Sequence, residues 1–343
     1  MKVLVTGGAG FIGAALVRRI LSDSRNSVIV LDYLTYAASR SRLEPSADPR
    51  RLMLERIDIR DAKETRQTVA HHSPDLIVHL AAESHVDRSI ASPHRTVETN
   101  VMGTLSMLEA SREYWSGLSP EGQARFRFHH VSTDEVYGSL GPTGYFKEDS
   151  AYDPRSPYSA SKAGADHLVR AWHNTFGLPV LISNCSNNYG PYQHPEKLIP
   201  TLIINALHGN RLPIYGDGQN VRDWLHVDDH VDAIMLILAS GEIGRTYCVG
   251  GGTERSNLDI AKMVCRILDH QNPRSDKLPH RELISFVPDR PGHDRRYAMG
   301  STRMQQELNW HPTRSFEAGI AETVAWYARN QAWYEPLLSP SAT

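Results

Sequence analysis

Cysteine is scarce in this chain of 343 residues. The three cysteines, Cys185, Cys248 and Cys265, lie far apart, and none belongs to a Cys-x-x-Cys pair. This spacing argues against a disulfide framework and against a zinc site built from paired cysteines. The 17 histidines include no His-Glu-x-x-His or similar ligand spacing, so we expect no protein metal site.

Long apolar runs and an excess of charge of one sign are also missing. No apolar run approaches the roughly 20 residues that cross a bilayer. Glycines interrupt the apolar N-terminus, which favours a strand and a helix over a signal peptide. The formal net charge of −2 gives no electrostatic case for nucleic acid or a membrane surface as partner. We therefore expect a cytoplasmic protein.

Short apolar runs alternate with longer amphipathic stretches through the first half of the chain. This alternation predicts an α/β fold with a doubly wound parallel sheet of the Rossmann type. The expected strands are 2–6, 28–31, 52–55, 76–80, 127–132 and 180–184, and the expected helices are 11–22, 61–71, 96–114 and 158–176. Asp61 is the expected N-cap of the second helix.

The texture of the sequence changes after about Asn184, where loops rich in Asn, Pro and Gly appear. Helical periods continue at 227–239, 257–268 and 315–330. We predict a smaller C-terminal region that interleaves with the first. The larger region would hold residues 1–184 and about 220–252, and the smaller one about 185–219 and 253–343. Residues 337–343 should be frayed.

The first strand and the first helix are joined by a glycine-rich turn. Gly7, Gly10 and Gly13 form Gly-x-x-Gly-x-x-Gly, which lets main-chain N–H groups approach a pyrophosphate at a helix N-terminus. Asp32 ends the second strand, 19 residues beyond Gly13. A carboxylate there accepts hydrogen bonds from the adenosine ribose and repels a 2′-phosphate, so the pattern favours NAD+ over NADP.

Sheet topology extends this cofactor site. Residues that follow the third and fourth strands should flank the adenine and the pyrophosphate. The full expected cofactor set is Gly7, Gly10, Phe11, Ile12, Gly13, Asp32, Thr35, Asp58, Ile59, Leu80, Ala81, Ala82, Thr99, Tyr158 and Lys162.

Tyr158 and Lys162 are four residues apart at the start of a helix and therefore share one face. A nearby ammonium and the positive nicotinamide ring would favour tyrosinate over the neutral phenol, whose reference pKa is about 10. Such a tyrosine can take a proton from a hydroxyl while hydride leaves the same carbon.

Two adjacent acids, Asp134 and Glu135, stand where the strand 127–132 should end. From spacing alone, a solvated turn explains them as well as a catalytic pair does. Consecutive side chains of a strand point to opposite faces. If both acids act on one ligand, the chain must have left the strand by Asp134.

At this point the sequence resembles the extended short-chain dehydrogenase/reductase superfamily, and within it the dTDP-glucose 4,6-dehydratases. The resemblance runs from about Lys2 to Trp333. It is carried by TGGAGFIG, LTYA, AAESHVDRSI, TNVMGT, STDEVYG, YSASKA, NCSNNYGPYQHPEKLIP, LPIYGDG, NVRDWLHV and PDRPGHDRRYA.

The resemblance implies a lyase that converts dTDP-glucose to dTDP-4-keto-6-deoxyglucose and water with NAD+. Tyr158 would act in oxidation at C4, with Lys162 beside it. Glu135 would be the base at C5 and Asp134 the acid for the 6-hydroxyl. Thr133 would bind the sugar 4-oxygen.

The resemblance also implies a nucleotide-sugar site and a homodimer packed through the helices 96–114 and 158–176. The expected substrate contacts are Ser84, Asn187, Lys197, Leu198, Pro213, Tyr215, Arg222, Asn257, Arg290, His293 and Tyr297. A dehydratase for UDP-glucose or another nucleotide sugar, a nucleotide-sugar 4-epimerase and a non-catalytic NAD-binding regulator remain as alternatives. An epimerase needs no base at C5, so the two acids argue against it.

Overall fold

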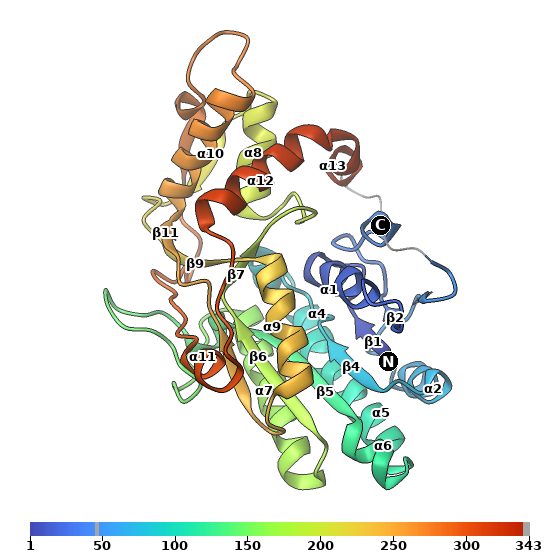
Figure 1. Cartoon of the computed structure of the whole chain (residues 1–343). Coiled ribbons are helices and arrows are strands. Elements are labelled where there is room, and N and C mark those ends of the chain that lie inside the picture. The colour runs from blue at the N-terminus through green and yellow to red at the C-terminus, as the bar shows by residue number, and fades with distance from the viewer. Residues whose placement is uncertain (45–47, 339–343) are drawn as a thin grey trace.

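A computed structural model describes residues 1–44 and 48–338, and in this part of the chain a seven-stranded sheet forms the centre (Figure 1). Its order is β10-β6-β5-β4-β1-β2-β3, and all neighbouring strands run parallel. The strands are β1 (Lys2–Thr6), β2 (Ser27–Leu31), β3 (Leu52–Glu55), β4 (Leu76–His79), β5 (Arg127–Thr133), β6 (Val180–Cys185) and β10 (Thr246–Val249). The predicted doubly wound sheet is confirmed.

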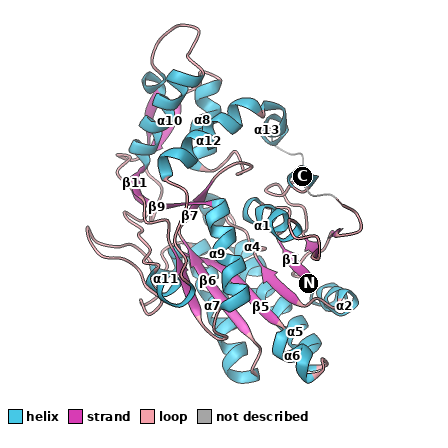
Figure 2. Ribbon diagram, viewed as in Figure 1, coloured by secondary structure: helices cyan, strands magenta, loops and turns pink. Residues whose placement is uncertain are grey.

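Helices cover both faces of this sheet and bury most of its strands, whereas the edge strand β3 is only partly buried (Figure 2). One apolar cluster joins β1 and β2 to α1 (Phe11–Leu21) and α9 (Val227–Ser240). A second cluster, on the other face, brings in α2 (Ala62–His72), α5 (Gly103–Ser116) and α7 (Pro157–Phe176). Buried Val, Ile and Leu dominate the strands, as expected for a parallel sheet covered on both sides.

The predicted helix 96–114 is part of a longer helical run with a change of winding. It consists of α4 (Pro93–Val97), a π-helical turn η3 (Glu98–Met102) and α5. Around it lie the short elements α3 (Val86–Ala91), α6 (Pro120–Arg125), η1 (Arg40–Arg42) and η4 (Asp134–Tyr137). The π-turn places the Asn100 amide against the Glu83 main chain and the Ser161 hydroxyl.

A smaller region forms around two minor sheets. One has the order β11-β9-β7, and the other pairs β12 with β8. Its elements are β7 (Asn187–Tyr189), α8 (Leu198–Leu207), β8 (Leu212–Tyr215), β9 (Val221–His226), β11 (Glu254–Ser256), α10 (Asn257–Gln271), η5 (His280–Leu283), β12 (Ile284–Val287), α12 (Phe316–Arg329) and α13 (Gln331–Leu338). They share an apolar core of their own.

The two regions interleave at more points than their predicted limits imply. β9 pairs with β7 and β11, although it opens the segment 220–252 that we assigned to the larger region. α11 (Thr302–Leu308) packs with β10 and α9, on the large sheet. The limits of the two regions stay a prediction. The predicted fraying of 337–343 falls largely on residues 339–343, which lie outside the described residues.

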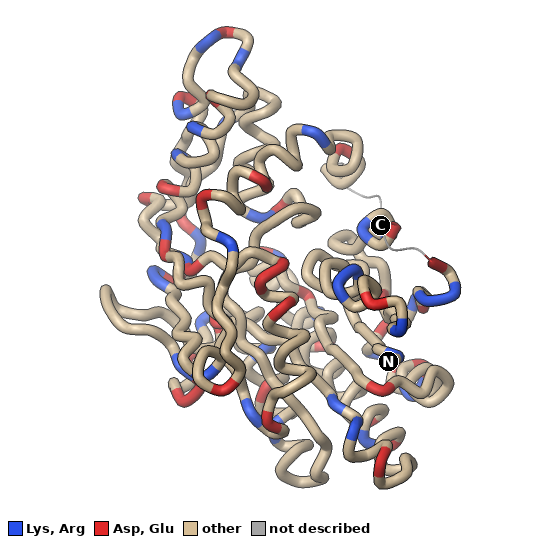
Figure 3. Tube along the Cα trace, viewed as in Figure 1, with Lys and Arg blue, Asp and Glu red and all other residues tan. Residues whose placement is uncertain are grey.

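Positive and negative side chains are interspersed along the described chain (Figure 3), in line with the nearly balanced charge of the sequence. No helix within residues 1–44 and 48–338 is long and apolar enough to cross a membrane.

A buried arginine connects the smaller region to the glycine-rich turn. The Arg42 guanidinium is fully buried and donates to the carbonyl oxygens of Ala9 (3.2 Å), Ala37 (2.6 Å) and Tyr192 (3.0 Å). Its carbon lies 5.2 Å from the ring centroid of Trp333 on α13. One side chain thereby joins β1's turn, the loop after β2, the loop before α8 and the C-terminal helix.

The N-cap of α2 gives a test of the local structure. The Asp61 carboxylate accepts a hydrogen bond from the Glu64 N–H at 2.9 Å, which confirms the predicted cap. Asp61→Ala should lower the free energy of unfolding by about 1 kcal/mol, measured by urea denaturation. Asp61→Asn, which keeps an accepting oxygen, should lose much less. Equal losses in both variants would contradict the capping role.

Candidate active site

Two adjoining cavities lie where the carboxyl ends of β1, β4, β5 and β6 meet the smaller region. The first has a volume of about 330 Å³ and the second about 580 Å³. Both are lined by Ser84, Glu135, Asn187, Glu196 and Lys197, so the two cavities form one continuous site. The carboxyl edge of a parallel sheet is where ligands of doubly wound folds bind.

The first cavity contains the glycine-rich turn. Gly7 has a φ of +68°, a left-handed conformation that favours glycine. A Cβ on Gly13 would lie 2.2 Å from the Gly7 carbonyl oxygen, so the turn has no room for a side chain there. The helix α1 starts at Phe11, and the Gly10 N-cap offers no side chain to its first N–H groups. These donors remain available to an anionic group.

Asp32 stands beside this turn as a fixed acceptor. Its two oxygens accept from the N–H groups of Ala9 (3.0 Å) and Leu34 (2.8 Å), and the residue is only 8% exposed. Burial raises the pKa of Asp32, while the two main-chain donors oppose that rise. Each oxygen keeps a lone pair for a ligand hydroxyl.

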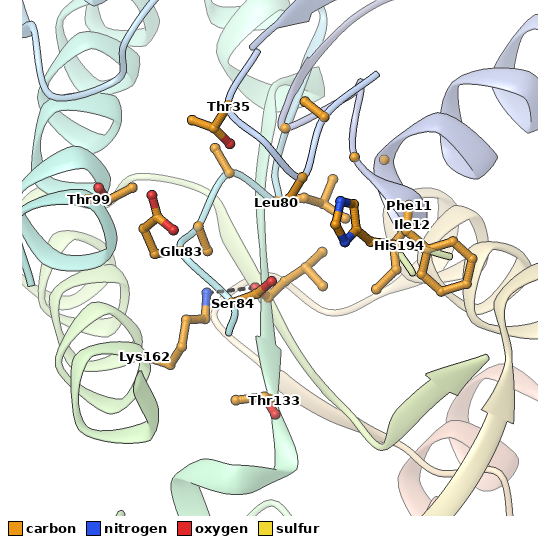
Figure 4. Close-up of a pocket in the computed structure, with 18 of the residues that line it drawn as sticks. Phe11, Ile12, Thr35, Leu80, Glu83, Ser84, Thr99, Thr133, Lys162 and His194 are labelled. Carbon is orange, nitrogen blue, oxygen red and sulfur yellow. Dashed lines mark hydrogen bonds between the residues drawn. The ribbon is translucent and has the colours of Figure 1, made fainter. Parts of the chain in front are cut away.

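The structure brings the whole predicted cofactor set to this first cavity. Figure 4 shows Thr35 at one end and Lys162 and Thr133 at the other. Sequence reasoning missed several further lining residues: Arg60, Glu83, Arg95, Ser186, Asn188, Gln193, His194 and Glu196. Gln193, His194 and Glu196 lie inside the NNYGPYQHPEKL segment, so that motif was the signal that could have found them.

The two acids meet in the same cavity because the chain leaves β5 after Thr133. The 3₁₀ turn η4 begins at Asp134, and the Thr133 hydroxyl accepts from the Glu135 N–H (3.3 Å) and donates to Asp134 Oδ1 (3.2 Å). This confirms the expectation that strand alternation ends before the two acids. Asp134 is buried, Glu135 is half-buried and both line one cavity, which excludes the solvated turn.

The two carboxyl groups differ in their surroundings. Burial raises the pKa of Asp134 well above its usual range, and the charges of Glu135 and Asp223 add to that effect. Burial also raises the pKa of Glu135, but Arg222, Lys197 and Arg290 oppose the rise. Asp134 is therefore the group that favours its protonated form, and Glu135 has the cations that stabilise a carboxylate.

Tyr158 lies at the second position of α7, after the Ser156 N-cap and its capping box with Ser159. Lys162 donates to the Val131 carbonyl oxygen at 2.9 Å, the dashed line in Figure 4. Burial and the charge of Glu135 raise the pKa of Tyr158 well above its usual value. The protein by itself therefore does not favour tyrosinate at Tyr158, contrary to our expectation. The reason is that the ammonium of Lys162 donates to the main chain.

The predicted substrate contacts all line the second cavity: Ser84, Asn187, Lys197, Leu198, Pro213, Tyr215, Arg222, Asn257, Arg290, His293 and Tyr297. Asp87, Thr201, Trp224 and Val287 line it as well and were missed, since no charge or spacing pattern marks them.

Two arginines of this cavity are held differently. Arg222 is 8% exposed, donates to the Asp294 carbonyl oxygen (3.0 Å) and stacks on Tyr297, 4.4 Å from the ring centroid. Arg290 forms a two-pronged ion pair with Asp87 (2.6 and 2.9 Å). No ion pair joins Arg222 to a carboxylate within the described chain, so of these two arginines Arg222 has the charge that is available to an anionic ligand.

The raised pKa of Asp134 predicts how stability depends on pH. The unfolded-state pKa of aspartate is about 3.9. The protonated Asp134 therefore stabilises the fold fully below that value, and this contribution is lost as pH rises toward the folded-state pKa. Asp134→Asn keeps a neutral side chain at every pH.

In urea unfolding at about pH 5 and about pH 8, Asp134→Asn should lose less stability over this interval than the unsubstituted protein. The difference should be about 1.4 kcal/mol for each pH unit over which only the folded form is protonated. Glu135→Gln serves as the matched control. Its loss of stability between the two pH values should stay closer to that of the unsubstituted protein. Parallel losses in the Asp134→Asn and unsubstituted proteins would contradict a neutral Asp134.

Comparisons with known proteins show which proteins this chain is similar to. A family model described as GDP-mannose 4,6 dehydratase matches residues 4–323. A curated dTDP-glucose 4,6-dehydratase of Shigella flexneri is 51% identical over 99% of this chain and 96% of that protein. The dTDP-glucose 4,6-dehydratase of Neisseria meningitidis serogroup B is 49% identical over 99% of this chain and 97% of that protein.

Solved structures of nucleotide-sugar enzymes are also similar to this chain. DesIV, a dTDP-glucose 4,6-dehydratase from Streptomyces venezuelae solved with NAD and TYD bound, has a TM-score of 0.90 and 46% identity, covering 98% of this chain and 100% of that one. A UDP-glucose 4-epimerase from Thermotoga maritima has a TM-score of 0.84 at 28% identity, covering 96% of this chain and 100% of that one. By these matches over nearly its whole length, the chain belongs to the dTDP-glucose 4,6-dehydratase family.

Proposed function

We propose that the protein converts dTDP-glucose to dTDP-4-keto-6-deoxyglucose and water, as an NAD-dependent lyase. The observation that carries this proposal is the pair Asp134 and Glu135, buried in one cavity with Tyr158 and Lys162. About half of the residues are shared with curated dTDP-glucose 4,6-dehydratases along nearly the full chain, which supports the same reaction.

The residues of the first cavity fit a dinucleotide. The glycine turn offers main-chain donors and no side chains to a pyrophosphate, and Asp32 offers carboxylate oxygens to ribose hydroxyls. When bound, NAD+ takes a hydride from C4 of the sugar and later returns it to C6. The chain's own residues then have to move three protons.

The first proton belongs to the sugar 4-hydroxyl, and we assign it to Tyr158. The nearby Thr133 side chain lowers the pKa of the Tyr158 phenol and opposes the effect of burial. Thr133 would hold the sugar 4-oxygen beside this phenol. Lys162, at the same end of the cavity, supplies positive charge to the developing tyrosinate.

The elimination uses the two acids separately. Glu135, the acid with three cations around it, would take the C5 proton that the 4-ketone makes acidic. Asp134, the acid that favours its neutral form, would protonate the 6-oxygen, which leaves as water. Glu135 then returns a proton to C5.

After one turnover, Tyr158 has gained a proton and Asp134 has lost one. The Thr133 hydroxyl donates to Asp134 Oδ1 and lines the same cavity as Tyr158, so it would carry the proton that resets the site.

The nucleotide half of the substrate would occupy the second cavity. Arg222 and Lys197 would bind the diphosphate, with Arg290 and His293 beside it. Pro213 and Tyr215 would pack on the pyrimidine. A UDP-sugar dehydratase is the second candidate, since uracil and thymine differ by one methyl group. The matches to curated dTDP-glucose enzymes favour thymine.

We also propose a homodimer packed through α4–α5 and α7. Large apolar side chains are exposed on these helices, namely Val97, Met102 and Phe176. Such groups are compatible with a helix-to-helix interface. A cytoplasmic location fits the three cysteines, which are all free and buried. Nucleic acid and membranes stay predicted non-partners.

An isotope experiment tests the reaction as a whole. Substrate that carries deuterium at C4 should give product with deuterium at C6, and C5 should take its hydrogen from solvent. Mass spectrometry and proton NMR of the product report both positions. Mixed labelled and unlabelled substrate should give no crossed products. An epimerase would return the label to C4, and that outcome would contradict the proposed reaction.

A variant separates the oxidation from the elimination. Glu135→Gln should lower the rate of C5–hydrogen exchange with deuterated water by about 10²–10⁴-fold, because the base is lost while the shape is kept. Asp134→Asn is the matched control: it should block release of water yet leave C5 exchange measurable. Exchange at the unsubstituted rate in Glu135→Gln would remove Glu135 from the role of base.

A further inference from the structure

The reaction proposed above leaves one buried carboxylate unused. Asp166 lies one helical turn beyond Lys162 on α7 and is fully buried. Its Oδ2 accepts from the Tyr152 hydroxyl (2.7 Å), the Ser132 hydroxyl (3.0 Å) and the Asn184 amide (3.1 Å). Three donors on one oxygen hold this carboxylate in place and favour its ionised form.

The other oxygen of Asp166 faces His130 on β5. His130 Nε2 lies 3.2 Å from Asp166 Oδ1 and 3.3 Å from Lys162 Nζ. Neither Asp166 Oδ1 nor His130 Nδ1 has another hydrogen-bond partner among the described residues. A proton on His130 Nε2 would therefore be donated to Asp166 Oδ1. The ammonium of Lys162 donates instead to the Val131 carbonyl oxygen.

Lys162 needs this carboxylate because its ammonium is buried without an ion-pair partner among the described residues. The residue is 4% exposed, and no carboxylate of the described chain lies within ion-pair distance of its ammonium. Burial lowers the pKa of Lys162 to about 8, and the charge of Asp166 is the largest effect that opposes this. An unpaired ammonium in such a place would tend to lose its proton.

Apart from Glu135 on the cavity side, the other titratable groups around this cluster are neutral or positive. Burial lowers the pKa of His130 to about 4 and that of His79 well below its usual value, and it raises the pKa of Cys185 to about 12. Tyr152 and Arg170 face Asp166 from the loop before α7 and from α7 itself. Asp134, Glu135 and Tyr158 lie on the cavity side. The pKa of Asp166 is lowered to about 2, so its charge persists at neutral pH.

We infer that Asp166, acting across His130, is a positioning residue that keeps Lys162 protonated in its buried site. The two full charges both lie beside Nε2 of one neutral imidazole, so the pair is neutral overall without direct contact. This arrangement leaves the ammonium free of a salt bridge that would hold it away from Tyr158. The role in turnover rests on the proposed function, whereas the charge coupling does not.

The first test is a pH profile of dTDP-glucose turnover. If Lys162 acts as the ammonium, the rate falls on the alkaline side as this group loses its proton. Asp166→Asn removes the negative charge, so this fall should move to lower pH by a unit or more. Activity should then drop at least about 10-fold near pH 8.5 but less than about 3-fold near pH 6.5.

Tyr152→Phe is the matched control. It removes one hydrogen bond to the same carboxylate oxygen but keeps the charge, so its alkaline limb should stay in place. An unmoved limb in Asp166→Asn, or an equal shift in Tyr152→Phe, would overturn the inference.

The second test requires no activity. Lys162→Met leaves Asp166 as an unpaired buried charge, and adding Asp166→Asn removes that charge. In urea unfolding, the double variant should therefore be more stable than the sum of the two single losses predicts. Additive losses would overturn the coupling.

If Asp166→Asn alone does not fold, the double variant decides: a folded double variant supports the coupling, and an unfolded one overturns it. Absence of turnover in the unsubstituted protein would refute the proposed function. The urea-unfolding comparison of the single and double variants would still test the charge coupling.

Discussion

The burial of two adjacent carboxyl groups is the constraint on which this site depends. Taking one carboxylate out of water is costly, and two side by side repel each other. Among the described residues, no cation forms an ion pair with Asp134, whereas three cations act on Glu135. Those cations come from the smaller region and not from the turn η4 that carries the acids.

This need explains why the two regions interleave. Arg222 stands on β9, Lys197 precedes α8, and Arg290 follows β12, so each reaches the carboxyl edge of β5 from a different segment. The larger region can hold a dinucleotide, but the three cations near Glu135 come from segments outside the central sheet. In the proposed reaction, the base and the binding of an anionic substrate would therefore depend on the same cations.

Much of this arrangement was readable from the sequence. The glycine spacing and Asp32 predicted the cofactor turn, since only a few residue types fit that geometry. The placement of Asp134 and Glu135 after β5 was predicted from alternation, because strands impose a period of two. The length of the helix 96–114 was underestimated, and its π-helical turn was missed, because local propensity is similar in both windings.

The remaining features depend on contacts between distant segments. Arg290 is engaged by Asp87, 203 residues away in the chain, and no local pattern announces this pair. The same holds for the position of α11 on the large sheet and for the direction of the Lys162 ammonium. Such features follow from tertiary packing, which cannot be predicted from the periodicity of one segment.

Arg42 has a consequence for how the chain tolerates change at its C-terminal end. Its guanidinium stacks on Trp333 while it holds the carbonyl oxygen of Ala9 within the glycine-rich turn. A truncation before Trp333 would uncover this cation and admit water beside the turn. The last helix, from which no residue lines either cavity, is thus linked to the glycine-rich turn through a single side chain.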